Sequence, residues 1–331
     1  MAGPHSNQPL LQVDALRVEI PGRRGTLVAV DGISFAIGEG EVLGVVGESG
    51  AGKSLTGAAV IGLLEPPCRI AGGEIRFDGR RIDNLPYEQL RRIRGRHIGM
   101  VFQDPLTSLN PLYTVGRQLT ETILTHSELS EKGARKRAVE LLQEVGIPAA
   151  EHRIDQYPHE FSGGMRQRVV IALALCANPR LIIADEPTTA LDVSIQAQII
   201  ALLKRLCREH GAAVMLVTHD MGVIAETADR VAVMYAGRIV EVGPVAEVVR
   251  RPKHPYTVGL MGSIPLVGHD VDRLTQIEGA MPRLDAIPPG CAFNPRCPRA
   301  FARCRQERPA LAPVELTDAA CWLYRDGERQ A

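Results

Sequence analysis

No stretch of this sequence stays apolar for the roughly 20 residues that a membrane-spanning helix needs. The first residues, Met1 to Leu10, lack the basic and then apolar pattern of a secretory signal. Formal charges balance to +0, which argues against a surface that coats nucleic acid. The sequence also has no internal repeat and no low-complexity tract. These absences predict a cytosolic chain that reaches a membrane only through a partner protein.

The composition is that of an ordinary folded protein. Apolar residues make up 45% of the chain and charged residues 23%. A length of 331 residues exceeds the size at which one hydrophobic core keeps growing. We therefore expect one main domain that carries a subdomain or an appendage.

A glycine-rich stretch follows the apolar run Leu43 to Val46 and precedes a helix start. It consists of Gly47, Glu48, Ser49, Gly50, Ala51, Gly52, Lys53 and Ser54. Its glycines allow the backbone N–H groups to point inward at anionic oxygens, and the following helix adds its positive end. Glycine-rich turns also occur without ligands, but the strand–loop–helix order favours an ATP site. Lys53 would neutralise the β and γ phosphates, and Ser54 would hold Mg²⁺.

Two further apolar runs end in polar residues. Leu181 to Ala184 precedes Asp185 and Glu186, and Val214 to Thr218 precedes His219. Such runs suit buried parallel strands, and ligands of open α/β sheets bind beyond the carboxyl ends of these strands. We expect one site to be built from these distant segments.

The two adjacent carboxylates suit different roles. Asp185 would accept a hydrogen bond from Mg²⁺-bound water, and Glu186 would polarise the water that attacks the γ-phosphate. The alternative is that Asp185 caps a helix before Pro187, but this leaves the upstream phosphate loop unexplained.

The remaining patterns predict an α/β fold with four segments. Residues 1–103 form the first part of a nucleotide-binding core and include an antiparallel β part from Leu11 to Ile37. Residues 104–165 form an inserted helical subdomain, and residues 166–255 form the second part of the core. Residues 256–331, where prolines become dense, form a C-terminal extension.

A second anion-binding helix end is predicted at Ser162, Gly163 and Gly164, which precede an amphipathic helix from Arg166 to Ala177. Ser162 would cap the helix, and the glycines would expose further N–H donors. A serine–glycine–glycine start is more often a plain cap. Its place shortly before Asp185 and Glu186, however, resembles the signature of the ATP-binding-cassette (ABC) ATPases.

Other segments agree with this resemblance. Gln103 looks like the Q-loop glutamine that contacts Mg²⁺, Ala190-Leu191-Asp192 looks like the D-loop, and His219 looks like the switch histidine. The resemblance implies a fold with a mixed sheet flanked by helices. It also implies that two cassettes pack head to tail, so that each ATP lies between one phosphate loop and the facing Ser162, Gly163 and Gly164.

Longer motifs resemble one branch of the family, the D-type ATPases of dipeptide and oligopeptide permeases. They span Asp104 to Pro111, Ala184 to Asp192, Tyr235 to Gly237 and His254 to Thr257. The resemblance implies a peripheral subunit at the cytoplasmic face of the membrane. It would pair with a sister ATPase beneath two permease subunits, which an extracytoplasmic peptide-binding protein supplies.

Several alternatives to peptide import stay open. The cargo could be a nickel chelate or glutathione, because the cargo would meet the permease and not this chain. The chain could also be an ABC ATPase that works on DNA or ribosomes, but the usual coiled-coil insertion or second cassette is missing. A regulatory module without turnover is disfavoured by the presence of Glu186 and His219.

The chain departs from the family pattern at two points. Met165 stands where the usual signature has glutamine, although methionine is common in the peptide-permease branch. No aromatic residue precedes Ala29 to stack on adenine. Leu27, Val28 and Arg24 occupy that neighbourhood, and apolar contact from Val28 or a guanidinium stack from Arg24 would substitute for it.

Four cysteines share a short, proline-rich segment with the spacing C-x5-C-x6-C-x16-C: Cys291, Cys297, Cys304 and Cys321. Four thiols together in a cytosolic chain indicate a metal site, and the spacing alone fits either Zn²⁺ or an iron–sulfur cluster. The resemblance to peptide-permease D subunits favours a [4Fe-4S] cluster, with Zn²⁺ as the alternative. The cluster would cross-link and stabilise an extension that has few apolar residues to bury.

Overall fold

The computed structural model describes residues 8–23, 25–189, 191–263 and 276–325. The chain divides into two compact units. The first contains the residues up to Leu10, Ile37–Glu41 and Asn84–Val217, and the second contains Leu11–Ala36, Val42–Asp83 and the chain from Thr218 onward. Among the described residues, no helix combines the length and apolarity required to cross a membrane.

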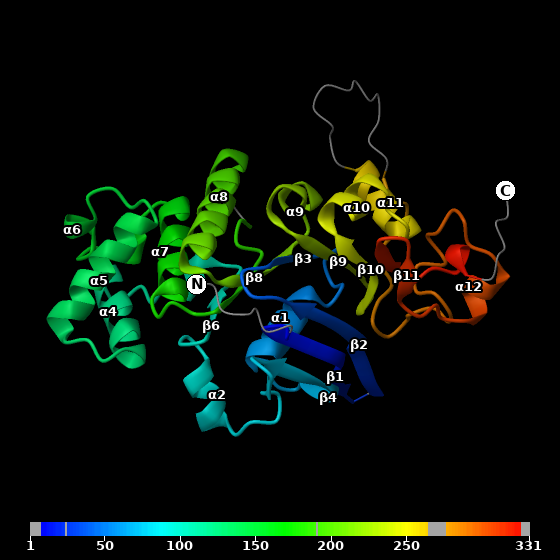
Figure 1. Cartoon of the computed structure of the whole chain (residues 1–331), viewed down its shortest axis with the longest axis horizontal. Helices are drawn as coiled ribbons and strands as arrows, with labels where there is room; N and C mark the ends of the chain where they lie inside the picture. Colours follow the sequence, from blue (N-terminus) through cyan, green and yellow to red (C-terminus); the bar gives the residue numbers. More distant parts are fainter. Residues whose placement is uncertain (1–7, 24, 190, 264–275, 326–331) are drawn as a thin grey trace. The chain divides into compact units, whose positions relative to one another are not determined.

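The second unit contains an antiparallel sheet in the order β2-β1-β4-β5, and Figure 1 shows β2, β1 and β4 side by side. Its strands are β1 (Leu11–Gly22), β2 (Gly25–Ile37), β4 (Arg69–Phe77) and β5 (Arg80–Arg81). Burial alternates along much of β1, where Leu11, Val13, Leu16 and Val18 point into the core. The predicted antiparallel part is confirmed, and β4 and β5, which lie outside the predicted range, complete it.

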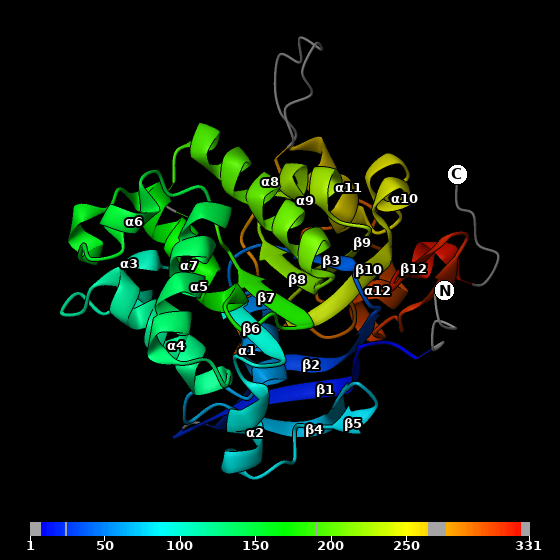
Figure 2. The ribbon, with the colours of Figure 1, turned by 60° about the vertical axis from the view of Figure 1, so that its left-hand side comes forward.

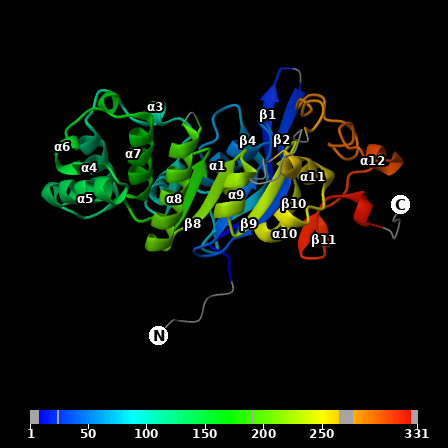
Figure 3. The same cartoon turned by 90° about the horizontal axis from the view of Figure 1, so that it is seen from above.

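A second sheet of this unit holds the strand before the phosphate loop. β3 (Val42–Val46) is buried throughout and pairs in parallel with β9 (Arg230–Tyr235). β9 pairs antiparallel with β10 (Arg238–Pro244), which lies beside it in Figure 3. β10 pairs antiparallel with β12 (Thr317–Ala319), and β12 pairs antiparallel with β11 (Ala312–Val314). The C-terminal extension therefore adds two short strands to the core sheet of its own unit.

Helices of the second unit are short. They are α1 (Lys53–Ile61), α9 (Met221–Thr227), α10 (Val245–Arg250), α11 (Pro255–Gly262) and α12 (Ala302–Gln306), with a 3₁₀ turn at Trp322–Tyr324. α9 packs on β3, where a Cβ on Gly44 would come within 2.7 Å of Ile224. Tyr235, Tyr256 and Phe293 stack edge-on or tilted in one aromatic cluster, which fastens the extension to β9 and α11.

The first unit contains three parallel strands, β6 (Ile98–Val101), β7 (Leu181–Asp185) and β8 (Ala213–Thr218), in the order β8-β7-β6. Every residue of β7 and β8 is buried. The runs predicted as buried strands at Leu43, Leu181 and Val214 are therefore confirmed.

Helices of the first unit gather beside these strands, and Figure 2 shows α4, α5 and α7 together. They are α2 (Tyr87–Ile93), α3 (Pro105–Ser108), α4 (Val115–His126), α5 (Glu131–Glu144), α6 (Ala150–Arg153), α7 (Gly163–Leu175) and α8 (Val193–His210), with a 3₁₀ turn at Pro158–Glu160. Side chains of Thr114 and Ser130 cap α4 and α5, and Gly146 (φ +76°) follows the end of α5. Ala138, Leu141, Leu142 and Val145 recur at helical spacing before Gly146 and Pro148, which predicts a helix here, and α5 confirms it.

One local prediction is wrong. The helix after Ser162 is not amphipathic, because Val169, Val170, Ile171 and Ala172 are consecutive residues and all are buried. α7 contacts β6 and the helices α3, α4, α5 and α8, so that it is enclosed on several sides.

Candidate functional site

The phosphate loop connects β3 to α1 as predicted. Gly52 is the N-cap of α1 with φ +98°, and Gly47 has φ +157°. A Cβ on Gly47 would lie 2.3 Å from the carbonyl oxygen of Met234, and a Cβ on Gly52 would lie 2.9 Å from that of Ala29. Glycine is therefore required at both positions by conformation and by space.

Lys53 is held inside this loop. Its side chain is 4% exposed, and Nζ donates to the carbonyl oxygens of Gly47 (2.8 Å) and Glu48 (3.1 Å). Ser54, in the first turn of α1, is exposed, as are Ser49 and Gly50 at the tip of the loop. The loop thus encloses the ammonium group of Lys53 and leaves Ser49, Gly50 and Ser54 exposed to solvent.

Glu48 is fastened by residues that sequence reasoning missed. Its backbone N–H donates to the hydroxyl of Tyr256 (2.9 Å), and its carboxylate accepts from Arg296 at 3.0 and 3.1 Å. Tyr256 belongs to the His-Pro-Tyr-Thr motif, but nothing in the motif itself indicates this partner.

The first unit brings Gln103 and Glu186 together. Gln103 Nε2 donates to Glu186 Oε2 (3.2 Å), and the Thr189 hydroxyl donates to the same oxygen (2.9 Å). The Glu186 backbone N–H donates to Val217 O (2.8 Å), and its φ of +44° is unusual for a residue with a side chain. Asp185, at the end of β7, is only 7% exposed. The contact from Thr189 was not predicted.

The other predicted residues lie at starts of helices. His219 is exposed after β8, and Asp220 caps α9 by accepting from the N–H groups of Gly222 and Val223. Ser162 caps α7 by accepting from Met165 N–H (3.4 Å), and Ser162 and Gly163 are exposed. The predicted cap is confirmed, and the first residues of the helix are open to solvent.

The candidate residues are divided between the two units. Gln103, Ser162, Asp185 and Glu186 belong to the first unit, and the phosphate loop and His219 belong to the second. Ala190 of the predicted D-loop and Arg24, one candidate for adenine stacking, lie outside the described residues. Val28, the other candidate, is half-buried.

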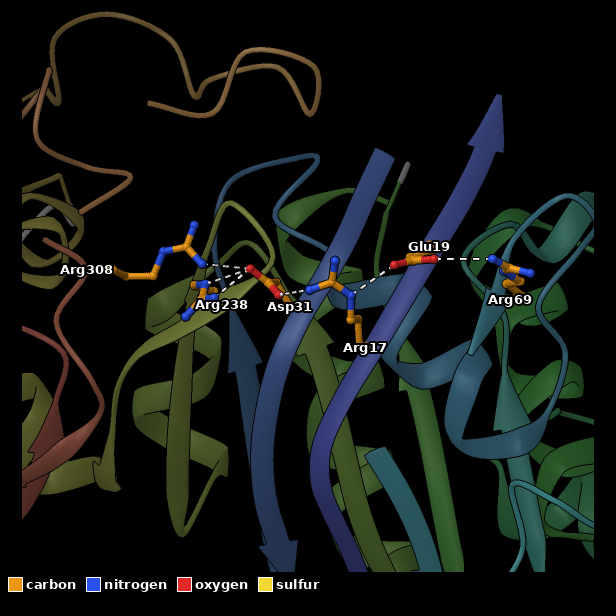
Figure 4. Close-up of polar contacts among 6 residues, drawn as sticks. All are labelled: Arg17, Glu19, Asp31, Arg69, Arg238 and Arg308. Atoms are coloured by element: carbon orange, nitrogen blue, oxygen red, sulfur yellow. Dashed lines mark hydrogen bonds and ion pairs between the residues drawn. The ribbon is translucent and has the colours of Figure 1, made fainter. Parts of the chain in front are cut away.

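Asp31, next to the segment expected near adenine, is surrounded by arginines (Figure 4). Its carboxylate accepts from Arg17 (2.8 Å), Arg238 (2.6 Å) and Arg308 (2.9 Å), and Arg17 also pairs with Glu19 (3.0 Å). Burial alone would raise the pKa of Asp31, but these arginines outweigh it and the pKa lies below its ordinary value. Arg308 thereby ties the C-terminal extension to the antiparallel sheet.

The four clustered cysteines line one small cavity of about 20 Å³. None forms a disulfide; Cys304 and Cys321 are buried, and Cys291 and Cys297 are half-buried. Burial and the neighbouring thiols raise the pKa of Cys291 to about 11 and that of Cys321 to about 12. Within the described parts of the chain, no group of three or more His, Cys, Asp or Glu side chains is arranged to hold a metal ion.

The remaining cysteines, Cys68, Cys176 and Cys207, stand in apolar or helical stretches of the sequence, which predicts that they are reduced and buried. Cys176 and Cys207 are buried, and burial raises the pKa of each to about 12. Cys68 is only half-buried, so the prediction is wrong at this position.

Comparisons with known proteins identify the family. Residues 30–189 match the ABC transporter family model, and residues 240–304 match the model of the oligopeptide/dipeptide transporter C-terminal region. The chain is 46% identical over 319 residues to the oligopeptide transport ATP-binding protein AppD of Bacillus subtilis, covering 96% of this chain and 97% of AppD. The chain belongs to the ABC transporter ATP-binding proteins, in their oligopeptide and dipeptide branch.

Other relatives and solved structures agree. The dipeptide transport ATP-binding protein DppD of Escherichia coli is 46% identical over 302 residues, which are 91% of this chain and 92% of DppD. The dimeric ATP-binding cassette MJ0796, solved in a post-hydrolysis state with ADP and phosphate, is 30% identical with a TM-score of 0.64. The match covers 71% of this chain and 98% of the MJ0796 chain. The fold is therefore that of an ABC ATPase cassette, and as a member of this family the chain is an ATPase.

Proposed function

We propose that this ABC ATPase powers the import of dipeptides and oligopeptides. The observation that carries the proposal is similarity over nearly the whole chain to peptide transport ATP-binding proteins, including their characteristic C-terminal region. The chain would be a peripheral subunit at the cytoplasmic face of the membrane. It would pair with a sister ATPase beneath two permease subunits, with an extracytoplasmic peptide-binding protein delivering the cargo.

ATP would bind at the phosphate loop, residues 47–54. Lys53 already lies inside the loop, and in our proposal its ammonium group exchanges carbonyl partners for the β and γ phosphates. The N–H groups of the loop and the start of α1 would bind the same oxygens. Ser54, Gln103 and Asp185 offer the oxygen ligands that Mg²⁺ prefers, and when bound this ion would offset phosphate charge.

Hydrolysis would depend on Glu186, with His219 and Gln103 assisting. Glu186 accepts two side-chain hydrogen bonds, which fix the direction of its carboxylate. A fixed carboxylate can orient the attacking water and take up its proton. His219 is exposed after β8, and in our proposal it contacts the γ-phosphate at the interface between cassettes.

The facing cassette would complete each ATP site. Ser162, Gly163 and Gly164 begin a helix whose N-terminal N–H groups suit an anion. We propose that they face the triphosphate bound by the sister subunit. Residues 104–165, as a helical subdomain, would relay the state of the nucleotide to the permease.

The C-terminal extension would hold a [4Fe-4S] cluster through Cys291, Cys297, Cys304 and Cys321. The donor set fits a cluster, since four cysteines that form no disulfide line one cavity. Because burial disfavours uncompensated thiolates here, loading would release protons. A bound cluster supplies four strong cross-links within a segment that contains little regular structure.

Metal analysis tests this assignment directly. Protein purified without oxygen should contain near-stoichiometric iron and sulfide and absorb visible light. Near-stoichiometric zinc in place of iron, with no absorption of visible light, would overturn the iron–sulfur assignment and show that the cysteines bind Zn²⁺.

Uptake by cells tests the transport function. In a strain that lacks this chain, the wild-type protein should restore accumulation of a radiolabelled dipeptide, and Glu186→Gln should not. Glu209→Gln, which changes an exposed carboxylate paired with Arg205, is the matched control. Restoration of nickel or glutathione uptake without peptide uptake would overturn the assigned cargo.

A further inference from the structure

We propose that Arg296 of the C-terminal extension is a positioning residue for ATP binding: it fixes Glu48 and, through Glu48, holds the phosphate loop around Lys53. The inference rests on the proposed role of Lys53. It assigns a function in nucleotide binding to a residue that lies 248 positions away from the loop.

The side chain of Arg296 is buried and held by hydrogen bonds to backbone carbonyl groups. Its side chain is 7% exposed, and Nε donates to Glu278 O (2.9 Å). Nη2 donates to Ile277 O (3.4 Å) and Gly279 O (3.2 Å), so backbone carbonyls fix one side of the guanidinium group. A guanidinium held by several acceptors retains little freedom and makes a rigid support.

The other side of the guanidinium group faces the phosphate loop. Nη1 lies 3.0 and 3.1 Å from the two carboxylate oxygens of Glu48 and 3.3 Å from the hydroxyl of Tyr235. Tyr256 accepts from the backbone N–H of Glu48. Both the main chain and the side chain of Glu48 are therefore held from outside the loop.

Glu48 in turn touches the groups that would bind phosphate. Its carbonyl oxygen accepts from Lys53 Nζ (3.1 Å) and from Ala51 N–H (3.1 Å). A displacement of Glu48 would therefore move an acceptor of Lys53 and open the turn of the loop.

Charge gives Arg296 a second role. The Glu48 carboxylate is 29% exposed and belongs to the loop that would receive a triphosphate. Without Arg296 this carboxylate would be unpaired and would repel the phosphates. Both effects predict that loss of Arg296 weakens ATP binding.

The test measures ATP affinity of the full-length chain by isothermal titration. Arg296→Ala should raise the Kd for ATP by about tenfold, as expected for breaking a mostly buried charge pair. Arg296→Lys, which keeps a charge near Glu48 but loses the planar fork, should lie between wild type and Arg296→Ala. The matched control is Arg303→Ala, which removes an ion pair with Glu307 and a ring contact with Trp322 in the same extension. The control should leave the Kd unchanged even where it lowers the melting temperature.

A double-mutant cycle separates positioning from general destabilisation. In a Glu48→Ala background, Arg296→Ala should change the Kd for ATP by less than about twofold, because the ion pair that connects Arg296 to the loop is already absent. A tenfold loss in both backgrounds, or a wild-type Kd for Arg296→Ala, would overturn the proposal. If Arg296→Ala fails to fold, Arg296→Lys is carried through the same cycle. Failure of peptide uptake would leave this result untouched, because the Kd is measured without a permease.

Discussion

Gln103 donates a hydrogen bond to Glu186 across 83 positions of sequence, with 3.2 Å between Nε2 and Oε2. Gln103 lies just after β6, and Glu186 just after β7, its parallel neighbour. Parallel pairing brings the two strand ends to one edge of the sheet. A residue expected to contact Mg²⁺ and one expected to orient water are thereby linked within one unit.

Replacement of Glu186 tests its role in hydrolysis. Glu186→Gln keeps the shape and the hydrogen bond from Thr189 but loses the proton acceptor. ATP hydrolysis by the assembled transporter should fall by about 10²–10⁴-fold while ATP binding persists. Phosphate release and nucleotide titration give the two quantities. Hydrolysis at the wild-type rate would show that another group acts on the water.

Substitution of Gly47 tests the geometry of the phosphate loop. Gly47→Ala places a methyl group 2.3 Å from Met234 O, so the loop or β9 must shift. We expect a loss of about 1–3 kcal/mol in stability and a loss of ATP binding. Gly72→Ala is the control, because its Cβ comes no nearer than 3.7 Å to Arg17. Normal ATP affinity in Gly47→Ala would contradict the loop geometry.

His254 predicts a dependence of stability on pH. It is buried, its Nδ1 caps α11 by accepting from Tyr256 N–H (3.1 Å), and burial lowers its pKa from 6.5 to about 3. Below pH 6.5 the unfolded chain binds a proton here and the folded chain does not. The contribution of His254 is thus complete above pH 6.5 and is lost as the pH falls toward about 3.

The expected slope is about 1.4 kcal/mol per pH unit from this one group. His254→Asn can still cap the helix but cannot titrate, so its unfolding free energy should vary less between pH 6.5 and 5. Urea unfolding at a series of pH values measures this difference. The control is the exposed His152→Asn, which should keep the wild-type slope. An unchanged slope in His254→Asn would show that His254 does not cause the pH dependence of stability.

Cys297→Ser tests the cysteine site and its connection to the nucleotide. Loss of one thiol should loosen the extension, which limited proteolysis after residue 276 would reveal as faster cleavage. Because Arg296 precedes Cys297 directly, ATP affinity should fall in the same variant. Cys68→Ser, outside the cluster, should change neither quantity. Cleavage of Cys297→Ser at the wild-type rate would contradict a structural metal at these cysteines.

Features encoded by neighbouring residues could be predicted from the sequence. Five apolar residues at Val42–Val46 form a buried strand, and Ser162 caps a helix, because strand burial and capping depend on residues close in the chain. Glycines at 47 and 52 likewise follow from the local path of the loop.

Contacts between distant segments could not be predicted in this way. The ion pair of Arg296 with Glu48 and the contact of Arg308 with Asp31 depend on where the C-terminal extension packs. The burial of α7 on several sides also depends on its neighbours, which periodicity within one helix does not report. Cysteine spacing grouped Cys291, Cys297, Cys304 and Cys321, but that they line one cavity depends on how the extension folds.

The most direct test of ATP-driven transport is the structure of the Glu186→Gln complex, with its sister ATPase and permease subunits, trapped with ATP. We predict that the phosphates contact Lys53 of this chain and a serine-led helix start of the facing cassette. ATP bound away from Lys53, or the absence of a facing cassette in the nucleotide-bound complex, would contradict the account.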